Sequence, residues 1–310
     1  MTRFSVIIPC KNDSPYLQDC LKHLKNMTFT DYEIIIIPDS KISIRGVKVI
    51  PLKSGPADKR DLGVKNAKGE YIAFIDDDAY PDKNWLSTSL KYFKDNVVAV
   101  GGPQITPKED SFLQRSSGRI FSSFLVGGLK ARYTSLSKSF FVDDWPTVNF
   151  IIKKSVFIEL GGFDSHYYPG EDTKLCLDLI NAGYKISYAP DCIVYHHRRK
   201  LFKEHLKQVS NYGIHRGLFV KKFPKTSFRL NYFIPSIITL FLLSSIFFVL
   251  TPLFNFYLTV LILYLSICFL FSISFKDPLT ILPTSLGIIL THFFYGIYFI
   301  KGLIVKEVER

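Results

Sequence analysis

Short apolar runs alternate with helix-forming segments over the first third of the chain. Near-continuous apolar character, as at 32–37, is typical of strands buried in a parallel sheet, and leucines three or four residues apart at 17, 21 and 24 predict a helix. This alternation predicts a doubly wound, mostly parallel α/β sheet, in which ligands bind beyond the carboxyl ends of the strands. The runs that predict strands are 4–9, 32–37, 47–50, 71–75 and 97–100.

The last third of the chain has a different pattern, with long apolar runs and no polar face. The runs at 233–250 and 253–275 carry no charge, and the run at 279–300 carries one titratable side chain, His292. Each is close to the roughly 20 residues that cross a bilayer. They predict three transmembrane helices within 231–303. A re-entrant hairpin of the first two runs, or three buried helices of a globular core, are the alternatives.

Charge is concentrated beside the first apolar run. The chain has 39 Lys and Arg against 27 Asp and Glu, a net charge of +12, and 198–229 contains ten of the bases and one acid. The 47% hydrophobic content excludes a disordered chain, and five cysteines in 310 residues exclude a disulfide scaffold. A basic segment next to a membrane span is expected to face the cytoplasm, where anionic lipid attracts it, so we expect an integral membrane protein with residues 1–197 on the cytoplasmic side. This placement of the charge argues against nucleic acid as the partner.

The predicted organisation follows from these patterns. We expect an α/β domain over 1–197 and basic juxtamembrane helices over 198–230. Transmembrane helices over 231–303 and a tail over 304–310 follow. The chain opens directly on a strand-like run, so no signal peptide is expected. Residues 104–145, rich in Ser, are interpreted as loops and short helices around the site.

Three adjacent carboxylates, Asp76, Asp77 and Asp78, follow the run at 71–75 directly. Such groups repel one another unless a cation neutralises them. Mg²⁺ and Mn²⁺ prefer oxygen ligands and commonly join one or two carboxylates to substrate phosphates. The triplet therefore favours a site for Mn²⁺ or Mg²⁺ and a diphosphate. A solvated turn is the alternative.

A second acidic pair, Glu171 and Asp172, stands at the predicted start of a helix, where the dipole favours an ionised carboxylate of the kind a general base needs. Simple helix capping is the alternative for this pair. His196 and His197 end a further strand-like run, where neighbouring side chains point to opposite faces, so one of them at most faces the site.

Other candidates have an equally plain structural alternative. Arg60 could clamp a diphosphate or be a solvated helix charge. Trp85 and Trp145 could stack on an acceptor sugar or pack in the core.

Taken in order, these motifs resemble the family 2 glycosyltransferases of the GT-A fold, over about residues 4–197. The resemblance rests on an ordered series: Val6–Asn12, Ile34–Ser40, Lys59–Gly63, Gly69–Asp78, Gly161–Asp164 with Gly170–Asp172, and Tyr188–His196. It implies an inverting, metal-dependent enzyme of class EC 2.4.

The resemblance also implies roles for individual residues. Asp172 would be the general base, with Glu171 near the acceptor. Asp78 and Asp76 would hold the metal, with His196 as a further candidate ligand. The donor nucleotide would contact Pro9, Asn12, Asp39, Arg60, Asp76 and Asp77.

Departures from the family pattern restrict the expected activity. Asp61 stands where members carry Asn, and Pro38-Asp39 replaces an acidic pair. The Q-x-x-R-W motif of polysaccharide synthases does not occur, so we expect transfer of a single sugar. The donor is expected to be a UDP-sugar and the acceptor lipid-linked, in assembly of a glycan precursor. A polyprenyl-phosphate sugar synthase, a nucleotidyltransferase and a non-catalytic membrane scaffold are the alternatives.

Overall fold

The computed structural model describes residues 2–126, 129–167 and 169–308, and its chain divides into two compact units. The α/β unit consists of Met1–Ile105 and Ala131–His197. The helical unit consists of Thr106–Lys130 and Arg198–Arg310.

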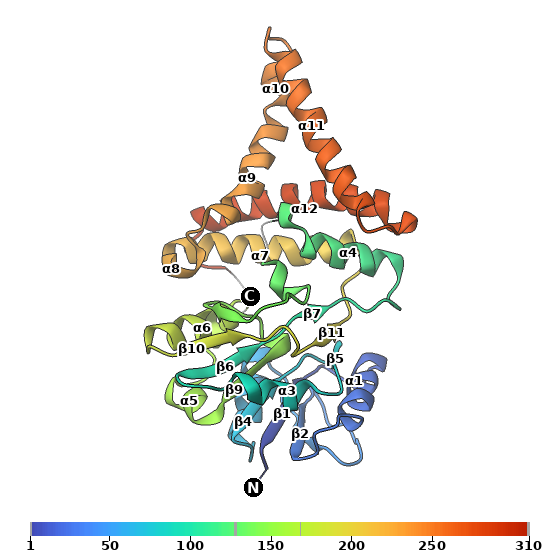
Figure 1. The fold of residues 1–310 in the computed structure, drawn as a ribbon. Helices are drawn as coiled ribbons and strands as arrows, with labels where there is room; N and C mark the ends of the chain where they lie inside the picture. Colours follow the sequence, from blue (N-terminus) through green and yellow to red (C-terminus); the bar gives the residue numbers. More distant parts are fainter. Residues whose placement is uncertain (1, 127–128, 168, 309–310) are drawn as a thin grey trace. The chain divides into compact units, whose positions relative to one another are not determined.

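A mixed eight-stranded sheet forms the centre of the α/β unit (Figure 1). Strands β3, β2, β1 and β4 run parallel to one another, β9 is antiparallel between β4 and β6, and β8 is antiparallel at the edge beside β10. In sheet order the strands are β3 (Lys48–Val49), β2 (Tyr32–Ile37), β1 (Phe4–Pro9), β4 (Tyr71–Phe74), β9 (Phe150–Lys153), β6 (Val97–Gly101), β10 (Lys185–Tyr188) and β8 (Phe140–Val142).

Helices cover both faces of this sheet, as the alternating pattern predicted. One core packs α1 against the sheet through Leu17, Leu21 and Leu24, the three leucines at helical spacing. The other packs α2 and α6 against the opposite face. The helices of this unit are α1 (Pro15–Lys25), α2 (Pro56–Lys65), α3 (Trp85–Ser89), α5 (Lys154–Glu159) and α6 (Glu171–Asn181).

A small second sheet joins the ends of distant segments. It has the order β5 (Ala79–Pro81), β11 (Val194–His196) and β7 (Gln104–Ile105). His196 pairs with Ala79 across β5 and β11, and the His197 amide donates to the Asp78 carbonyl at 3.0 Å. The small sheet therefore fixes the two histidines against the acidic triplet.

The helical unit contains the long apolar helices. Three of them are long and apolar enough to cross a membrane, over Leu230–Phe248, Phe254–Ile273 and Pro278–Ile304. Its helices are α4 (Phe112–Ser122), α7 (Lys203–Lys222), α8 (Pro224–Ser227), α9 (Leu230–Leu243), α10 (Ser245–Phe248), α11 (Phe254–Ile273) and α12 (Pro278–Ile304).

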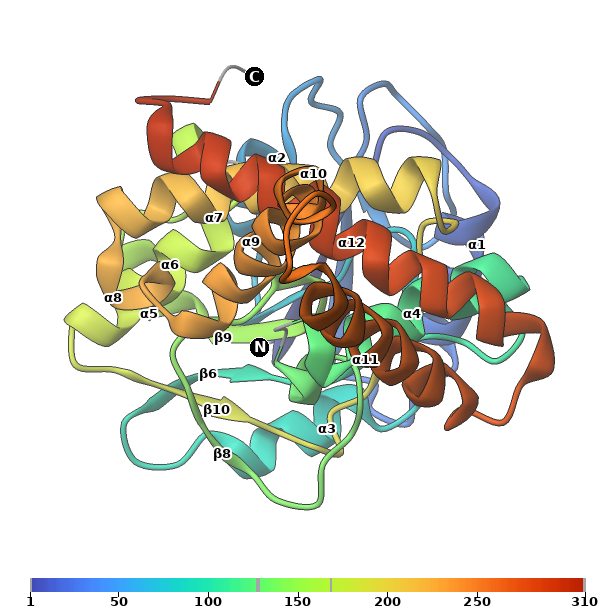
Figure 2. The same cartoon turned by 90° about the horizontal axis from the view of Figure 1, so that it is seen from above.

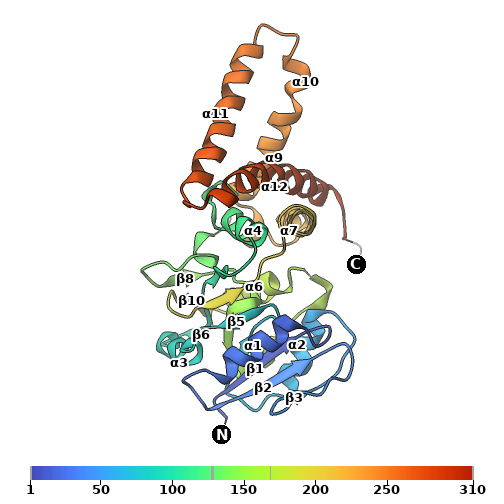
Figure 3. The ribbon, with the colours of Figure 1, turned by 90° about the vertical axis from the view of Figure 1, so that its right-hand side faces the viewer.

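These three apolar segments are not equivalent. In Figures 1 and 3, α9, α10 and α11 form a hairpin whose base packs on α12 and whose α10 end projects away from it, whereas α12 runs along α7. Seen from above, α12 lies over both α7 and α4 (Figure 2). The contact with α7 is close: a side chain at Gly217 would come within 2.2 Å of the Phe299 carbonyl oxygen, and one at Gly302 within 2.1 Å of the Ile214 carbonyl oxygen.

Polar side chains hold α12 and the residue just before it against α4 and α7. His205 of α7 bridges the hydroxyl groups of Ser117 on α4 and Thr291 on α12, at 2.8 and 2.9 Å. Arg119 of α4 pairs with Asp277, just before α12, at 2.9 Å. The described part of 106–130, interpreted from sequence as part of the loops and short helices around the site, thus contains α4 and packs with the C-terminal helices.

Candidate active site

Two acidic segments of the α/β unit are brought together by one buried arginine. Arg60, on α2, is 4% exposed. Its Nη2 donates to Asp76 Oδ1 at 2.7 Å, and its Nη1 donates to Glu171 Oε1 at 3.1 Å. Asp76 follows β4 and Glu171 begins α6, so the guanidinium joins the end of a central strand to the N-terminus of a helix. The solvated alternative for Arg60 is wrong.

The acidic triplet and one histidine form a cluster of possible metal ligands. One ligand atom from each of Asp76, Asp78 and His196 lies within 4.8 Å of the others. His196 Nε2 is 3.1 Å from Asp78 Oδ1, and His196 Nδ1 is 2.8 Å from Gln104 Oε1. His197 faces away from the cluster and stacks on Tyr16, with ring centroids 4.7 Å apart.

The contact with Gln104 determines which nitrogen of His196 is free for a ligand. With a proton on Nδ1, the ring donates to Gln104 Oε1 and its Nε2 lone pair points at the Asp78 carboxylate. In that tautomer Nε2 and the Asp78 carboxylate would both be ligands for a cation between them. Two carboxylates and an imidazole suit Mn²⁺ or Mg²⁺, so the donor set fits a divalent cation.

Asp77 is the third member of the triplet and has a different environment. Burial raises the pKa of its carboxyl to about 7, and the neighbouring charges of Asp78 and Asp76 add to this rise. A cation at the cluster would offset that repulsion.

The predicted general base lies in the first turn of α6. Asp172 Oδ1 accepts from the Thr173 amide at 2.7 Å. Burial raises the pKa of Asp172 to about 7, and the charges of Glu171 and Asp144 contribute to the same shift. A carboxyl with a pKa near 7 suits proton transfer at neutral pH.

Glu171 is held more tightly than its neighbour. The residue is 4% exposed, and its two carboxylate oxygens accept from Arg60 and from the Gly170 amide at 3.1 and 3.0 Å. Both oxygens are therefore occupied by the protein, and Glu171 acts in this structure as a tie between α2 and α6.

Asp144 was missed by the sequence analysis and belongs to this region. Its carboxylate accepts from Thr173 Oγ1 at 3.0 Å and pairs with Arg132 Nη2 at 3.1 Å. It supports the first turn of α6 from the segment before β9. The only signal in the sequence was an acidic pair, 143–144, directly before a tryptophan.

The predicted nucleotide residues lie around the carboxyl ends of β1 and β2. Pro9 ends β1, and Asn12 is exposed in the following turn. Asp39 follows β2 and pairs with the buried Lys59 ammonium, which also donates to the Cys10 carbonyl. The hydrogen bond from Lys59 lowers the pKa of Asp39. Lys59 was not among the predicted site residues.

The two tryptophans lie in the core, away from any acceptor. Both are 0% exposed. Trp85 Nε1 donates to Asn149 Oδ1 at 2.9 Å, and Trp145 Nε1 donates to the Gly102 carbonyl at 3.2 Å. Neither indole has a face open to a sugar, so the structure gives both the packing role that was the alternative.

Comparison with known proteins agrees with this fold. The family model described as glycosyl transferase family 2 matches residues 5–161. The chain therefore belongs to glycosyl transferase family 2.

Individual relatives are about a quarter identical to the chain over the residues that align. A pre-mycofactocin glycosyltransferase of Mycobacterium tuberculosis is 26% identical over 67% of this chain and 46% of its own length. The chain thus spans about half the length of that relative. A dolichyl N-acetyl-alpha-D-glucosaminyl phosphate 3-beta-D-2,3-diacetamido-2,3-dideoxy-beta-D-glucuronosyltransferase of Methanococcus voltae is 28% identical over 72% of this chain and 75% of its own length.

A solved structure supports the fold over nearly the whole chain. The mannosyltransferase PcManGT of Pyrobaculum calidifontis, in complex with GDP-Man and Mn²⁺, aligns with a TM-score of 0.60 at 14% identity. The alignment covers 97% of this chain and 87% of that protein. It confirms the predicted GT-A-like α/β domain followed by apolar helices.

Proposed function

We propose that the protein transfers a single sugar from a nucleoside diphosphate sugar to a lipid-linked acceptor at a membrane surface. The observation that carries this proposal is the cluster of Asp76, Asp78 and His196, joined through Arg60 to the start of α6. In a family 2 chain with this cluster, one unit contains both the groups that would bind the donor diphosphate and the group that would accept the proton of the acceptor hydroxyl.

Asp76, Asp78 and His196 would hold a Mn²⁺ or Mg²⁺ ion. When bound, such an ion neutralises the negative charge that develops on a departing nucleoside diphosphate. The solved neighbour from Pyrobaculum contains Mn²⁺, which supports the choice of metal. Arg60, already paired with Asp76, adds a fixed positive charge beside the cluster.

Asp172 is the proposed general base. Its carboxylate takes the proton of the acceptor hydroxyl as that oxygen forms a bond to the anomeric carbon of the sugar. The bond from the anomeric carbon to the diphosphate oxygen breaks, and its electron pair leaves with the nucleoside diphosphate. Attack opposite the leaving group inverts the configuration. Burial, with the charges of Glu171 and Asp144 added to it, raises the pKa of Asp172 and makes its carboxylate a stronger proton acceptor.

The lipid-linked acceptor is supported by two observations. The Methanococcus relative acts, by its name, on a sugar carried by a dolichyl phosphate. The helical unit also contains three segments apolar enough to enter a bilayer. The predicted cytoplasmic orientation comes from the basic residues of 198–229 and stays part of the proposal.

We further propose how the helical unit meets the bilayer. The segments Leu230–Phe248 and Phe254–Ile273, of 19 and 20 residues, are each long enough to cross the hydrocarbon core as a hairpin. Helix α12 packs along α7, which contains five basic residues and one acidic residue. Placing both helices across the core would bury those charges, so α12 would lie with α7 at the membrane surface.

A nucleotide-sugar screen tests the proposed activity. The full chain in detergent, with Mn²⁺ and a membrane lipid extract as acceptor source, should release nucleoside diphosphate from one donor. UDP-sugars are tried first, and GDP-sugars are included because the Pyrobaculum neighbour contains GDP-Man. Asp172→Asn should abolish release, whereas Asp178→Asn on the same helix should not. Release that does not need lipid, or that persists in Asp172→Asn, contradicts the proposal.

A further inference from the structure

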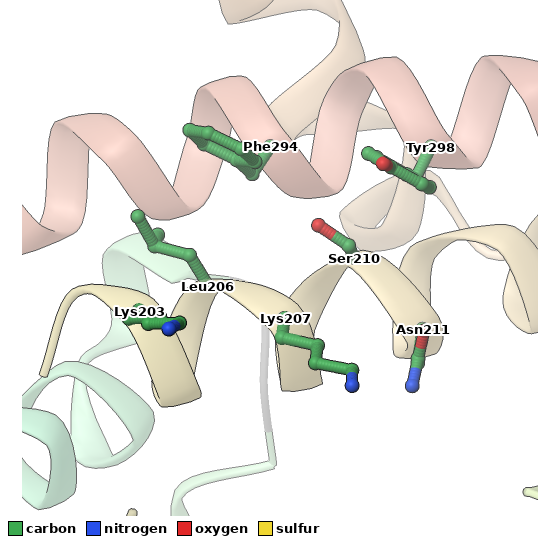
Figure 4. A pocket seen from close by; sticks show the side chains of 7 residues that line it. All are labelled: Lys203, Leu206, Lys207, Ser210, Asn211, Phe294 and Tyr298. Atoms are coloured by element: carbon green, nitrogen blue, oxygen red, sulfur yellow. The ribbon is translucent and has the colours of Figure 1, made fainter. Parts of the chain in front are cut away.

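A groove of about 430 Å³ lies between α7 and α12 inside the helical unit (Figure 4). Its size falls within the range of small-ligand sites, about 300 to 1,000 Å³. The residues that line it lie outside 5–161, the part of the chain that the family model matches. The proposed sugar transfer therefore leaves this groove without a role.

One wall of the groove is basic and polar. Lys203, Lys207, Ser210 and Asn211 are spaced along one face of α7, at intervals of one, three or four residues. In Figure 4 the two lysines and the asparagine come from the same side of the helix. Among the described residues, neither Lys203 nor Lys207 forms an ion pair. Two ammonium groups one helical turn apart are available for an anion.

The other wall is apolar and aromatic. Phe294 and Tyr298 of α12, one turn apart, face Leu206 of α7 across the groove. Rings and a leucine offer no counter-charge to the lysines, but they suit a hydrocarbon chain. The groove thus combines a site for an anionic head with a surface for an apolar tail.

The surroundings of the groove are those of a membrane boundary. The exposed face of α12 is apolar along its length, with large hydrophobic side chains at Leu279, Leu282, Leu286, Ile297 and Ile304. Basic residues lie on the neighbouring α7. With the helical unit at a membrane surface, as proposed above, a lysine pair on a helix beside such a face would lie at the height of lipid phosphates.

We propose that this groove binds the phosphate of an anionic membrane phospholipid, with Lys203 and Lys207 holding the phosphate. Ser210 and Asn211 add hydrogen-bond donors, and an acyl chain lies on Leu206 and Phe294. The proposal rests on membrane attachment of the helical unit and is independent of the sugar-transfer chemistry. A lipid held there fixes the α7–α12 pair at the level of the headgroups.

The test measures lipid binding to the full chain. Native mass spectrometry from a non-ionic detergent follows titration with dioctanoyl phosphatidylglycerol, with phosphatidylcholine of the same chain length, and with inorganic phosphate. We expect phosphatidylglycerol to bind more tightly than the other two. Lys203→Gln with Lys207→Gln should weaken that binding at least about tenfold. Phe294→Ala should weaken phosphatidylglycerol binding without changing the response to inorganic phosphate.

A matched control separates this site from general attraction to basic residues. Lys221→Gln with Lys222→Gln removes the same charge from the same helix outside the groove, and should change binding by less than about twofold. Equal weakening by both double variants would overturn the proposal, as would unchanged binding in Lys203→Gln with Lys207→Gln. Equal affinity for inorganic phosphate would show a free-anion site and overturn the lipid assignment. The single Lys207→Gln variant gives the same comparison if a double variant does not fold.

Discussion

Replacing Asp172 with asparagine should remove activity and stabilise the α/β unit. Asparagine keeps an oxygen that can accept from the Thr173 amide, the bond that Asp172 makes at 2.7 Å. It removes the charge whose burial, beside Glu171 and Asp144, raises the pKa of Asp172 from 3.8 to about 7. The buried charge of the base lowers the stability of the fold but is needed for activity, so removing it should raise stability and abolish function.

The size and sign of the effect follow from the shifted pKa. A rise in pKa from 3.8 to about 7 means that the buried charge of Asp172 lowers the free energy of unfolding by at most about 4 kcal/mol at high pH. This value is the upper limit of the stability that Asp172→Asn can gain. Loss of a favourable helix-dipole interaction would reduce this gain by up to about 1 kcal/mol. Because the folded-state pKa lies above the unfolded value, the wild type loses stability as the pH rises through about 7. Between pH 6 and pH 8.5 this loss is on the order of 1 kcal/mol.

Urea unfolding followed by tryptophan fluorescence measures this difference. The chain has two tryptophans, Trp85 and Trp145, and both lie in the α/β unit. The stability gained by Asp172→Asn should be larger at pH 8.5 than at pH 6 by on the order of 1 kcal/mol. Turnover should fall by about 10² to 10⁴ at both pH values.

Asp178→Asn is the control for the same helix. Asp178 pairs with Lys174 at 2.6 Å near the surface, so its replacement should change stability by less than about 1 kcal/mol, equally at both pH values. The reasoning is refuted if Asp172→Asn is less stable than wild type at pH 8.5, or if its effect does not depend on pH.

Three further changes test other parts of the structure. Asp78→Asn should weaken Mn²⁺ binding, read by electron paramagnetic resonance, at least about tenfold without changing urea stability; unchanged binding would remove the metal assignment. Asp61 accepts from a backbone amide at 3.0 Å, and burial raises its pKa to about 6. Asp61→Asn should therefore keep activity and be more stable at pH 8, whereas Asp61→Ala should lose about 1 to 3 kcal/mol. Because all five cysteines are buried, single cysteines at Thr251, Lys276 and Glu307 can be labelled from one side of sealed vesicles. Lys276→Cys and Glu307→Cys should react from the same side and Thr251→Cys from the other, whereas a spanning α12 would separate 276 from 307.

Five strands of the eight-stranded sheet, β1, β2, β3, β4 and β6, could be predicted because each lies in a short apolar run with its own boundaries, whereas β8, β9 and β10 were missed. The run at 4–9 is β1, and the run at 32–37 is β2. Helix α4 could not be recognised in the same way. Its apolar contacts come from residues far along the chain: Ile120 packs with Leu201 and Ile288. A segment whose partners are this distant looks like a loop when only its neighbours in sequence are considered.

The candidate site could be predicted for groups that stand together in sequence. The acidic triplet and the 196–197 histidine pair were visible as motifs, and period-two alternation correctly limited the metal cluster to one histidine. Pairings between distant residues could not be inferred. Arg60 and Glu171 are 111 positions apart. Lys59 of α2 pairs with Asp39, which follows β2 and is 20 positions away. Such contacts depend on the topology of the sheet, which residue types alone do not give.

The case of α12 shows what hydropathy measures and what it does not. A run of apolar residues indicates that a segment is buried away from water, but it does not distinguish burial in lipid from burial in protein. In α12, glycine and threonine lie on the buried face, where Gly302 approaches the backbone of α7 and Thr291 bonds to His205. Leucine and isoleucine occupy the exposed face. A helix can pack on protein with one side and face lipid with the other. Such a helix is expected to have small and polar residues on the protein side and large aliphatic residues on the lipid side. The difference between the two faces of α12 cannot be seen when hydropathy is averaged over a window of consecutive residues. It makes α12, despite its 27 apolar-rich residues, the least suited of the three segments to cross the bilayer alone.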